Sequence, residues 1–165
     1  MPSPPERDLI AALIEELALR NQAPKFAPHV TLFAGEVERE RALACLSAVD
    51  SDALELEVES IRCSDAFTKT VYLQLRQTAA ALELSSTISD EIGDDGEYLF
   101  DPHLSLIYKA LTAQQKAEIA ANVSLPFEKV RFDRVRVIHG PAQTRTAEDV
   151  NAWTVLAERS LLQLS

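Results

Sequence analysis

Two copies of a histidine-containing pentapeptide carry the clearest chemical signal in the chain. Residues 28–32 read Pro-His-Val-Thr-Leu, and residues 102–106 read Pro-His-Leu-Ser-Leu. Their histidines, His29 and His103, are 74 residues apart (103 − 29), close to half of the 165 residues. One histidine on an apolar strand is usually structural, but repetition of the whole string favours a functional role.

Each pentapeptide predicts a short strand with its polar groups on one face. Side chains at positions i and i+2 of a strand share a face, so His29 lies beside Thr31 and His103 lies beside Ser105. If two similar halves pack about a pseudo-twofold axis, the four polar groups meet across one cleft. Two imidazoles, each with an ordinary pKa of about 6.5, and two hydroxyls can hold a phosphate while protons move on and off its oxygens.

Apolar periodicity predicts the elements that position these residues. Recurrence every three or four residues predicts helices over residues 6–20, 37–49, 78–92 and 112–122. Thr112 is the expected N-cap of the last helix. Alternation and short β-rich runs predict strands over residues 26–33, 54–62, 67–76 and 103–108, and further strands within 127–139 and 152–161. The order strand–helix–strand–strand thus occurs twice, which predicts two similar α+β halves.

The charge balance restricts the class of ligand. The chain has 16 Lys and Arg against 26 Asp and Glu, a net charge of −10 at pH 7. A protein that tracks long RNA or DNA needs a basic surface, so this excess argues against that class. A small anionic ligand is compatible with it, because a local pocket can be positive on an acidic protein. The 4 glycines form no phosphate-binding loop of Walker or Rossmann spacing.

Cysteine usage and hydropathy favour an intracellular protein without a structural metal. Cys45 and Cys63 are too few for a disulfide framework and lack metal-ligand spacing, so we expect both to be buried as small apolar residues. The first residues lack the features of a secretory signal, and no apolar run approaches the roughly 20 residues that span a bilayer. We expect a cytoplasmic protein that acts away from membranes, and a monomer.

The paired motifs resemble those of the two-histidine (2H) phosphoesterases, which carry two His-x-[Thr/Ser]-x strings with apolar x. The second string with its tyrosine, residues 103–108 (His-Leu-Ser-Leu-Ile-Tyr), is most similar to the cyclic nucleotide phosphodiesterase branch of plants and fungi. Residues 67–73 and the end of the chain around Trp153 also look similar to that branch, so the resemblance covers roughly residues 6–162. Members of the family begin with a strand before the first helix, whereas this chain enters its helix almost at once.

The resemblance implies one bilobal domain over residues 1–165, with two pseudo-symmetric lobes, each an antiparallel sheet flanked by helices, and motifs that face a central cleft. It also implies an enzyme: a cyclic phosphodiesterase that needs no metal and no other cofactor. In it His29 and His103 form the acid–base pair, while Thr31 and Ser105 donate hydrogen bonds to the phosphate. We take His103 as the base and His29 as the acid, although the residues themselves leave this order open.

The implied partner is a small cyclic-phosphate nucleotide. A 2′,3′-cyclic nucleotide would yield the 2′-phosphate, and ADP-ribose 1″,2″-cyclic phosphate would yield the 1″-phosphate. Hydrolysis of either needs one base to deprotonate water and one acid to protonate the leaving alkoxide, and histidine suits both roles.

Three further residues are weaker candidates for substrate contacts. The resemblance points to a ligand contact for Tyr108, with packing as an equal alternative; strand alternation puts its side chain opposite that of Ser105 unless the strand bends there. Lys69 shares strand parity with Phe67 on an otherwise apolar face, so it either reaches water at the sheet end or points to an anion in the cleft. Phe67 can stack on a base, with core packing as the simpler alternative.

The other conspicuous residues favour structural roles. His139 precedes a Gly-Pro turn and has no hydroxyl two positions later, so we expect a structural or surface histidine. Trp153 is expected in the core. The glutamates that alternate along residues 54–62 are expected on a solvated face.

Two rival functions share the implied fold. A binding module would hold a nucleotide or an RNA end without turnover, but binding alone needs no acid–base pair, so the histidines and hydroxyls favour an enzyme. A 2′-5′ RNA phosphoesterase or ligase would act on tRNA-like substrates, and the net charge of −10 disfavours it. The exception would be a local basic strip beside the cleft, formed by Lys25, Lys69 and Lys109.

Overall fold

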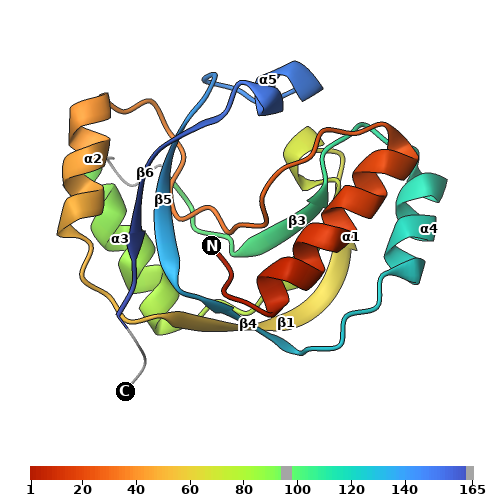
Figure 1. The fold of residues 1–165 in the computed structure, drawn as a ribbon, viewed down its shortest axis with the longest axis horizontal. Coiled ribbons are helices and arrows are strands. Elements are labelled where there is room, and N and C mark those ends of the chain that lie inside the picture. The colour runs from red at the N-terminus through yellow and green to blue at the C-terminus, as the bar shows by residue number, and fades with distance from the viewer. Residues whose placement is uncertain (94–97, 163–165) are drawn as a thin grey trace.

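Two antiparallel sheets form the centre of the molecule (Figure 1). The computed structural model describes residues 1–93 and 98–162. The larger sheet has the strand order β3-β2-β1-β4. Its strands are β1 (Leu54–Cys63), β2 (Val71–Leu75), β3 (His103–Ile107) and β4 (Lys129–Phe132). The smaller sheet pairs β5 (Arg134–His139) with β6 (Thr154–Ser160).

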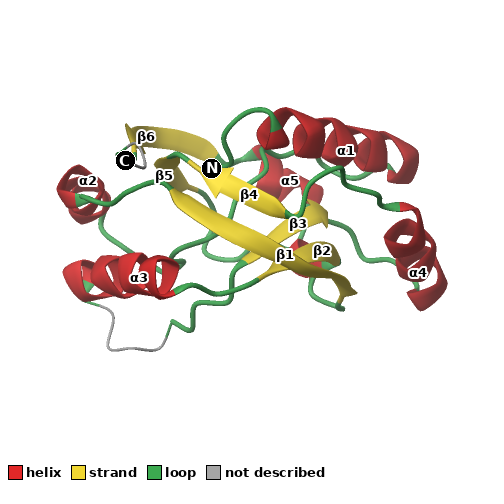
Figure 2. Cartoon of the chain, turned by 90° about the horizontal axis from the view of Figure 1, so that it is seen from below, coloured by secondary structure: helices red, strands yellow, loops and turns green. Residues whose placement is uncertain are grey.

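The helices divide between the two sheets. α1 (Glu6–Asn21) contacts β3, and α4 (Ala113–Asn122) contacts β1 and β2, so both flank the larger sheet. α2 (Arg39–Ala48) contacts β5, β6 and α3 (Ala79–Ile92), so this pair lies beside the smaller sheet (Figure 2). The predicted α+β class, with helix-flanked antiparallel sheets, is therefore confirmed. Among the described residues no helix is both long and apolar enough to cross a membrane.

One face of the larger sheet packs the main core. Leu104 and Leu106 of β3 are fully buried, and Leu73 of β2 lies opposite Leu104 in the ladder. Ile10 and Ile14, on the inner side of α1, belong to the same apolar cluster. Burying side chains of this size stabilises the fold by about 1.5–3 kcal/mol each. Because the alternate positions of β3 hold this core, the motif's polar side chains are left to face the other way.

The chain passes from one sheet to the other through β4 and β5, which only Asp133 separates. β1 pairs with β4 along residues 54–57 and with β2 along residues 58–63, with a register shift between residues 58 and 60. Such a shift bends a strand and increases its twist. The larger sheet is accordingly curved, and β5 leaves its edge to form the second sheet (Figure 1).

Most predicted elements are confirmed. The predicted helices are present as α1 to α4, and the strands predicted over residues 54–62 and 103–108 are β1 and β3. The N-cap of α4 is also as predicted. The Thr112 hydroxyl accepts a hydrogen bond from the Gln115 amide (3.3 Å), and the Gln115 side chain accepts one from the Thr112 amide (2.9 Å).

Two local predictions are wrong, and one helix was not predicted. Residues 26–33 form no strand, so the strand–helix–strand–strand order is incomplete in the first half. Residues 67–76 divide into a 3₁₀ turn (Phe67–Lys69) and β2, because the Thr70 hydroxyl donates back to the carbonyls of the turn. The loop before the last strand contains a short helix, α5 (Ala147–Asn151), which starts at a Thr146 capping box.

The segment before α1 is more ordered than the sequence indicates. Pro2 forms an isolated antiparallel bridge with Phe132, and the Ser3 amide donates to the Arg131 carbonyl (2.7 Å). Residues 1–3 thus extend along β4 ahead of the first helix, where the family resemblance places a strand.

Side-chain exposure overturns the expectation for one of the two cysteines. Cys45 is buried on α2 as predicted, but Cys63 is exposed because β1 extends beyond the core at its last residues. Leu9 belongs to the apolar spacing of α1 yet is 45% exposed, whereas its neighbour Ile10 is fully buried. Leu9 therefore lies at the edge of the helix stripe and outside the core.

Replacing Leu106 tests the core behind the second motif. Leu106 is 0% exposed, whereas Leu19 on α1 is 66% exposed. We expect Leu106→Ala to lower the free energy of unfolding by about 2–5 kcal/mol, because it removes buried methylenes and leaves a cavity. Leu19→Ala makes the same chemical change at the surface and should stay within about 0.5 kcal/mol of the wild type. Urea denaturation measures both, and equal effects would contradict this assignment of the core.

Candidate active site

The second motif is presented by the β3–β2 ladder. His103 lies opposite Gln74, and Ser105 lies opposite Tyr72, so these four side chains share one face of the larger sheet. Leu104 and Leu106 point into the core on the other face. The alternation predicted for this motif is therefore confirmed.

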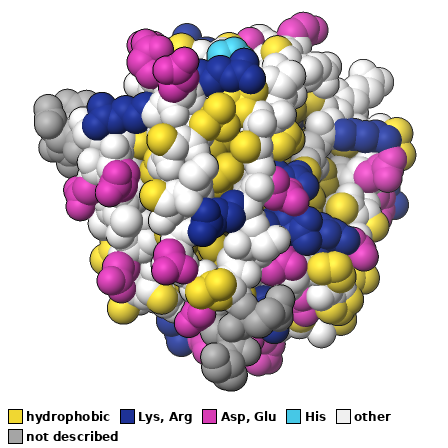
Figure 3. Space-filling view, turned by 60° about the vertical axis from the view of Figure 1, so that its left-hand side comes forward, with side chains coloured by type: hydrophobic (Ala, Val, Ile, Leu, Met, Phe, Trp, Pro, Cys, Tyr) yellow, Lys and Arg dark blue, Asp and Glu magenta, His cyan; other side chains and the backbone are white. Residues whose placement is uncertain are grey.

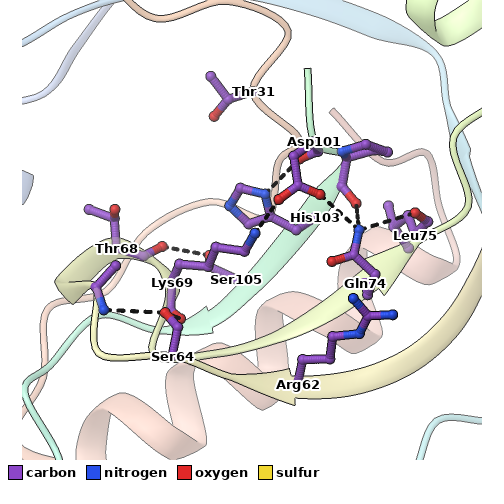
Figure 4. A network of polar contacts seen from close by, with 12 residues as sticks. Thr31, Arg62, Ser64, Thr68, Lys69, Gln74, Leu75, Asp101, His103 and Ser105 are labelled. Carbon is purple, nitrogen blue, oxygen red and sulfur yellow. Dashed lines mark hydrogen bonds and ion pairs between the residues drawn. The ribbon is translucent and has the colours of Figure 1, made fainter. Parts of the chain in front are cut away.

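The first motif lies on an irregular segment. His29 and Thr31 are half-buried, and Val30 and Leu32 pack against the apolar core. Val30 and Leu32 therefore point inward as predicted, although residues 26–33 do not form the predicted strand. Thr31 lies across from His103 and Ser105 (Figure 4).

Both imidazoles are anchored in the same way. Nδ1 of His29 lies 2.7 Å from the Ala27 carbonyl oxygen, and Nδ1 of His103 lies 2.8 Å from the Asp101 carbonyl oxygen. A carbonyl only accepts hydrogen bonds, so each Nδ1 carries a proton and donates it. Each Nε2 is thereby left as the nitrogen that can take up or release a proton at a ligand.

Tyr108 connects the two motifs. Its hydroxyl lies 3.4 Å from Nε2 of His29, and its ring stacks on Phe26 with centroids 3.8 Å apart and planes 8° apart. Burial raises the pKa of the phenol well above its usual range, and a hydrogen bond with Ser105 offsets only part of this, so the hydroxyl stays neutral. β3 ends at Ile107, so strict alternation ends with it, and Tyr108 reaches Ser105 by the exception predicted for a strand that bends there.

Aromatic rings surround His29. Phe26 and Trp153 meet the imidazole edge-on, with centroids 6.1 and 5.9 Å away. The Trp153 indole N–H donates to the Thr144 hydroxyl (3.2 Å), and a Cβ at Gly140 would lie only 2.6 Å from the indole. Trp153 is thus half-buried beside His29, which corrects its predicted place in the core.

Phe67 lies beside Tyr108. Its ring centroid is 6.3 Å from that of Tyr108, and the side chain is half-buried in the 3₁₀ turn. Both earlier alternatives, base stacking and packing, are compatible with this position.

Lys69 and Asp101 form an ion pair beside His103 (Figure 4). The Asp101 carboxylate also accepts a hydrogen bond from Gln74 (2.9 Å), while its backbone carbonyl holds His103. The Lys69 ammonium lies 4.5 Å from the centroid of the Tyr72 ring, within range of a cation–π interaction. The strand parity predicted for Lys69 is wrong, because the residue belongs to the 3₁₀ turn.

The two site hydroxyls differ in their present partners. Ser105 Oγ donates to the Thr68 carbonyl (2.7 Å), which the 3₁₀ turn presents. Ser105 is buried, whereas Thr31 is half-buried on the opposite segment. A ligand that is to receive the Ser105 proton must therefore replace the Thr68 carbonyl.

The electrostatics favour neutral imidazoles. Burial lowers the pKa of His29 below 6.5; the hydrogen bond to Ala27 opposes this, and the charges of the N-terminus and His103 add to it. Burial also lowers the pKa of His103; the Asp101 carbonyl opposes this, while the nearby Lys69 charge lowers the pKa further.

The remaining sequence candidates lie away from the imidazoles or are already paired. His139 is exposed at the end of β5, as expected. Lys25 pairs with Glu15, and Lys109 donates to the carbonyls of Asn21 and Gln22. Within the described ranges, no three His, Cys, Asp or Glu side chains form a group that could hold a metal ion.

Sequence reasoning missed the polar neighbours of the second motif. Gln74 and Tyr72 join the site through strand register, which the chain order does not reveal. Arg62 of β1 lies opposite Tyr72 and continues the same polar row (Figure 4). Asp101 had one local signal: it precedes Pro102-His103 at the position that Ala27 occupies in the first motif.

Comparison with known proteins assigns the family. A sequence model of the 2′-5′ RNA ligase superfamily matches residues 2–143. The chain belongs to this superfamily. Membership confirms the resemblance to the two-histidine phosphoesterases at the level of the superfamily. It also supports an enzyme that acts on phosphodiesters.

Solved structures share the fold of this superfamily member. Apo LigT from E. coli superposes with a TM-score of 0.62 at 20% identity, over 97% of this chain and 93% of LigT. LigT complexed with 3′-AMP gives 0.60 at 18% identity, over 93% and 91%. TT0787 of Thermus thermophilus gives 0.56 at 18% identity, over 96% and 94%. No curated protein sequence matches the chain.

The Lys69 charge provides a test of the site electrostatics. Since this charge lowers the pKa of His103, Lys69→Met is expected to raise it, and the Asp101 carboxylate left without its partner acts in the same direction. NMR titration of the imidazole Cε1–H signals measures the shift. Lys25→Met is the matched control, because Lys25 pairs with Glu15 and should leave both histidines unchanged. An unchanged or lowered pKa of His103 in Lys69→Met would contradict the described geometry.

Proposed function

We propose that this superfamily member is a metal-independent cyclic phosphodiesterase, which hydrolyses a 2′,3′-cyclic nucleotide or ADP-ribose 1″,2″-cyclic phosphate by acid–base catalysis between His29 and His103. The observation that carries the proposal is the matched anchoring of the imidazoles, with each Nδ1–H on a carbonyl and each Nε2 left for the substrate. The similarity of residues 103–108 to the plant and fungal branch supports the cyclic substrate. Under this proposal the chain works as one domain, as a monomer and in the cytoplasm.

The proposed reaction needs two proton transfers. Nε2 of the base takes a proton from water, and the water oxygen forms a bond to phosphorus. The bond between phosphorus and the 3′-oxygen breaks, and Nε2 of the acid gives that oxygen a proton. The product is the 2′-phosphate with a free 3′-hydroxyl. At this point the base is protonated and the acid is neutral, and transfer of one proton through solvent returns both imidazoles to their starting states.

Three hydroxyls are suited to hold the phosphate. Thr31 and Ser105 belong to the motifs, and Tyr108 lies between them with a neutral hydroxyl next to Nε2 of His29. Donors fixed in a partly buried site stabilise the charge that develops on the phosphate oxygens. Ser105 reaches the phosphate by exchanging its bond to the Thr68 carbonyl for one to the ligand.

The environment of His103 supports its role as the base. Lys69 disfavours the protonated form of His103, which keeps Nε2 able to accept a proton from water. At His29 burial lowers the pKa as well, and the smaller contributions come from the charges of the N-terminus and His103 instead of a lysine. An anionic phosphate favours protonated imidazole, so substrate binding itself supplies the protonated state that an acid at position 29 needs.

A second candidate is a 2′-5′ RNA phosphoesterase or ligase, which the name of the superfamily favours. The cations that would form a basic strip are engaged: Lys69 with Asp101, Lys25 with Glu15, and Lys109 with backbone carbonyls. Acidic and basic side chains also lie interspersed on the face shown in Figure 3. The LigT complex with 3′-AMP supports a ligand of mononucleotide size for the shared fold.

Removal of either motif histidine should abolish most turnover. His29→Ala and His103→Ala are expected to lower kcat on a 2′,3′-cyclic nucleotide by about 10²–10⁴, the loss typical of a missing general acid or base. His139→Ala, an exposed histidine at the end of β5, is the matched control and should keep wild-type kcat. Phosphorus NMR follows the product, and circular dichroism checks that each variant is folded.

A substrate with a better leaving group separates the acid from the base. p-Nitrophenolate leaves without protonation, so loss of the acid matters little for a nucleoside p-nitrophenyl phosphodiester, whereas loss of the base still prevents activation of water. We expect His29→Ala to regain activity on this ester and His103→Ala to remain impaired. The reverse result would exchange the two roles.

The pH dependence follows from the lowered imidazole pKa values. Catalysis needs one neutral and one protonated imidazole, so kcat/KM rises as the base loses its proton and falls as the acid loses its own. Burial lowers the pKa of both His29 and His103, so the maximum of kcat/KM is expected below pH 6.5. EDTA should leave the profile unchanged. A maximum on the alkaline side, or an absolute requirement for a divalent cation, would refute this mechanism.

Substrate length tests whether the paired lysines and the net negative charge disfavour a long RNA substrate. With its flanking lysines engaged, the site should turn over a 2′,3′-cyclic mononucleotide at least as efficiently as a ten-mer RNA with the same end. For single strands log K falls by about 0.7 per phosphate contact and per decade of salt. Comparing kcat/KM across a salt series measures this. A preference for the ten-mer that grows at low salt would instead support the RNA phosphoesterase candidate.

A further inference from the structure

The two motifs are held by different means. The second motif belongs to a strand and is fixed by its ladder with β2. Residues 26–33, which carry the first motif, belong to no strand, and within the described residues they form no backbone–backbone hydrogen bond. Something else must orient His29 and Thr31, because a site of this kind requires its groups to be held in place before the substrate arrives.

Two side-chain hydroxyls bind consecutive carbonyls of the first motif. Ser85 Oγ on α3 donates to the Leu32 carbonyl (2.7 Å), and the Tyr98 hydroxyl donates to the Thr31 carbonyl (3.2 Å). Successive carbonyls of a straight strand point to opposite edges. The chain bends at Leu32, which allows both carbonyls to reach the side where α3 lies.

Both donors are themselves fixed. Ser85 is 3% exposed, so its hydroxyl has little access to water as an alternative partner. The ring of Tyr98 packs on Phe33 with centroids 5.3 Å apart, and Phe33 in turn lies over Gly35, where a Cβ would be only 2.9 Å from the phenyl ring. Two hydroxyls and one aromatic contact thus act on the three residues that follow Val30.

We propose that Ser85 and Tyr98 are positioning residues for the first motif, whose hydroxyls hold the carbonyls of Leu32 and Thr31 and thereby orient His29 and Thr31. These two hydrogen bonds fix the backbone of the first motif, as the ladder with β2 fixes the backbone that carries His103 and Ser105. Neither residue touches the imidazole, and both act through the backbone. The expected effect on kcat rests on the proposed phosphodiesterase function, whereas the expected effect on the orientation of His29 does not.

Removal of single hydroxyls tests this arrangement with little change of shape. Ser85→Ala and Tyr98→Phe are each expected to lower kcat on a 2′,3′-cyclic nucleotide by about tenfold, and together by about a hundredfold, with KM changed much less, because a displaced catalytic group loses rate. Ser86→Ala, at the exposed neighbour of Ser85 on α3, is the control and should retain wild-type kcat. Thermal unfolding checks that all variants remain cooperatively folded.

The second readout needs no substrate. In NMR titrations the Cε1–H signal of His29 should shift in Ser85→Ala and Tyr98→Phe, while that of His103, fixed by its ladder, stays unchanged. If the wild type shows no phosphodiesterase activity, the proposed function fails, and this readout alone decides the role of Ser85 and Tyr98. An unchanged His29 signal, equal shifts of both histidines, or variants with wild-type kcat in an active enzyme would overturn the proposal.

Discussion

The hydrogen bond from histidine Nδ1 to the carbonyl two residues earlier determines what the rest of the site can do. At 2.7 Å for His29 and 2.8 Å for His103, it fixes the tautomer and the direction of each ring. Both bonds skip a proline, which lacks an amide proton and restricts the residue before it to extended conformations. The proline that precedes each histidine therefore helps to orient the imidazole.

Around this shared bond the two halves diverge. His103 stands in a polar, charged environment with Asp101, Lys69 and Gln74, whereas His29 stands among aromatic rings. Burial lowers both pKa values; the Lys69 and Asp101 charges act in addition on His103, and the charges of the N-terminus and His103 act in addition on His29. Two like groups placed in unlike environments can take unlike roles, which is the usual way that a pair of titratable residues divides acid and base work.

Much of this arrangement could be predicted from local sequence patterns. The helices, the buried faces of α1 and β3, the Thr112 cap and the pairing of His103 with Ser105 on one face all depend on spacing within a few residues. The family match also agrees with the resemblance that the duplicated motif indicates.

The predictions that failed depend on contacts between distant segments. Thr70, which follows the 3₁₀ turn at residues 67–69, bonds to the Lys109 carbonyl (2.8 Å), which lies 39 residues away. Residues 26–33 have β-forming side chains, but among the described residues no strand edge pairs with them, and the position of Tyr108 depends on where β3 ends. Register placed Gln74 and Arg62 on the site face, and no pattern within either segment encodes register.

The position of Trp153 has an optical consequence. It is the single tryptophan in the chain, and its indole lies 5.9 Å from the rings of both His29 and Tyr108. A protonated imidazole quenches indole emission far more than a neutral one does. The intrinsic fluorescence of this protein is therefore a direct signal of the protonation state of His29, without any added label.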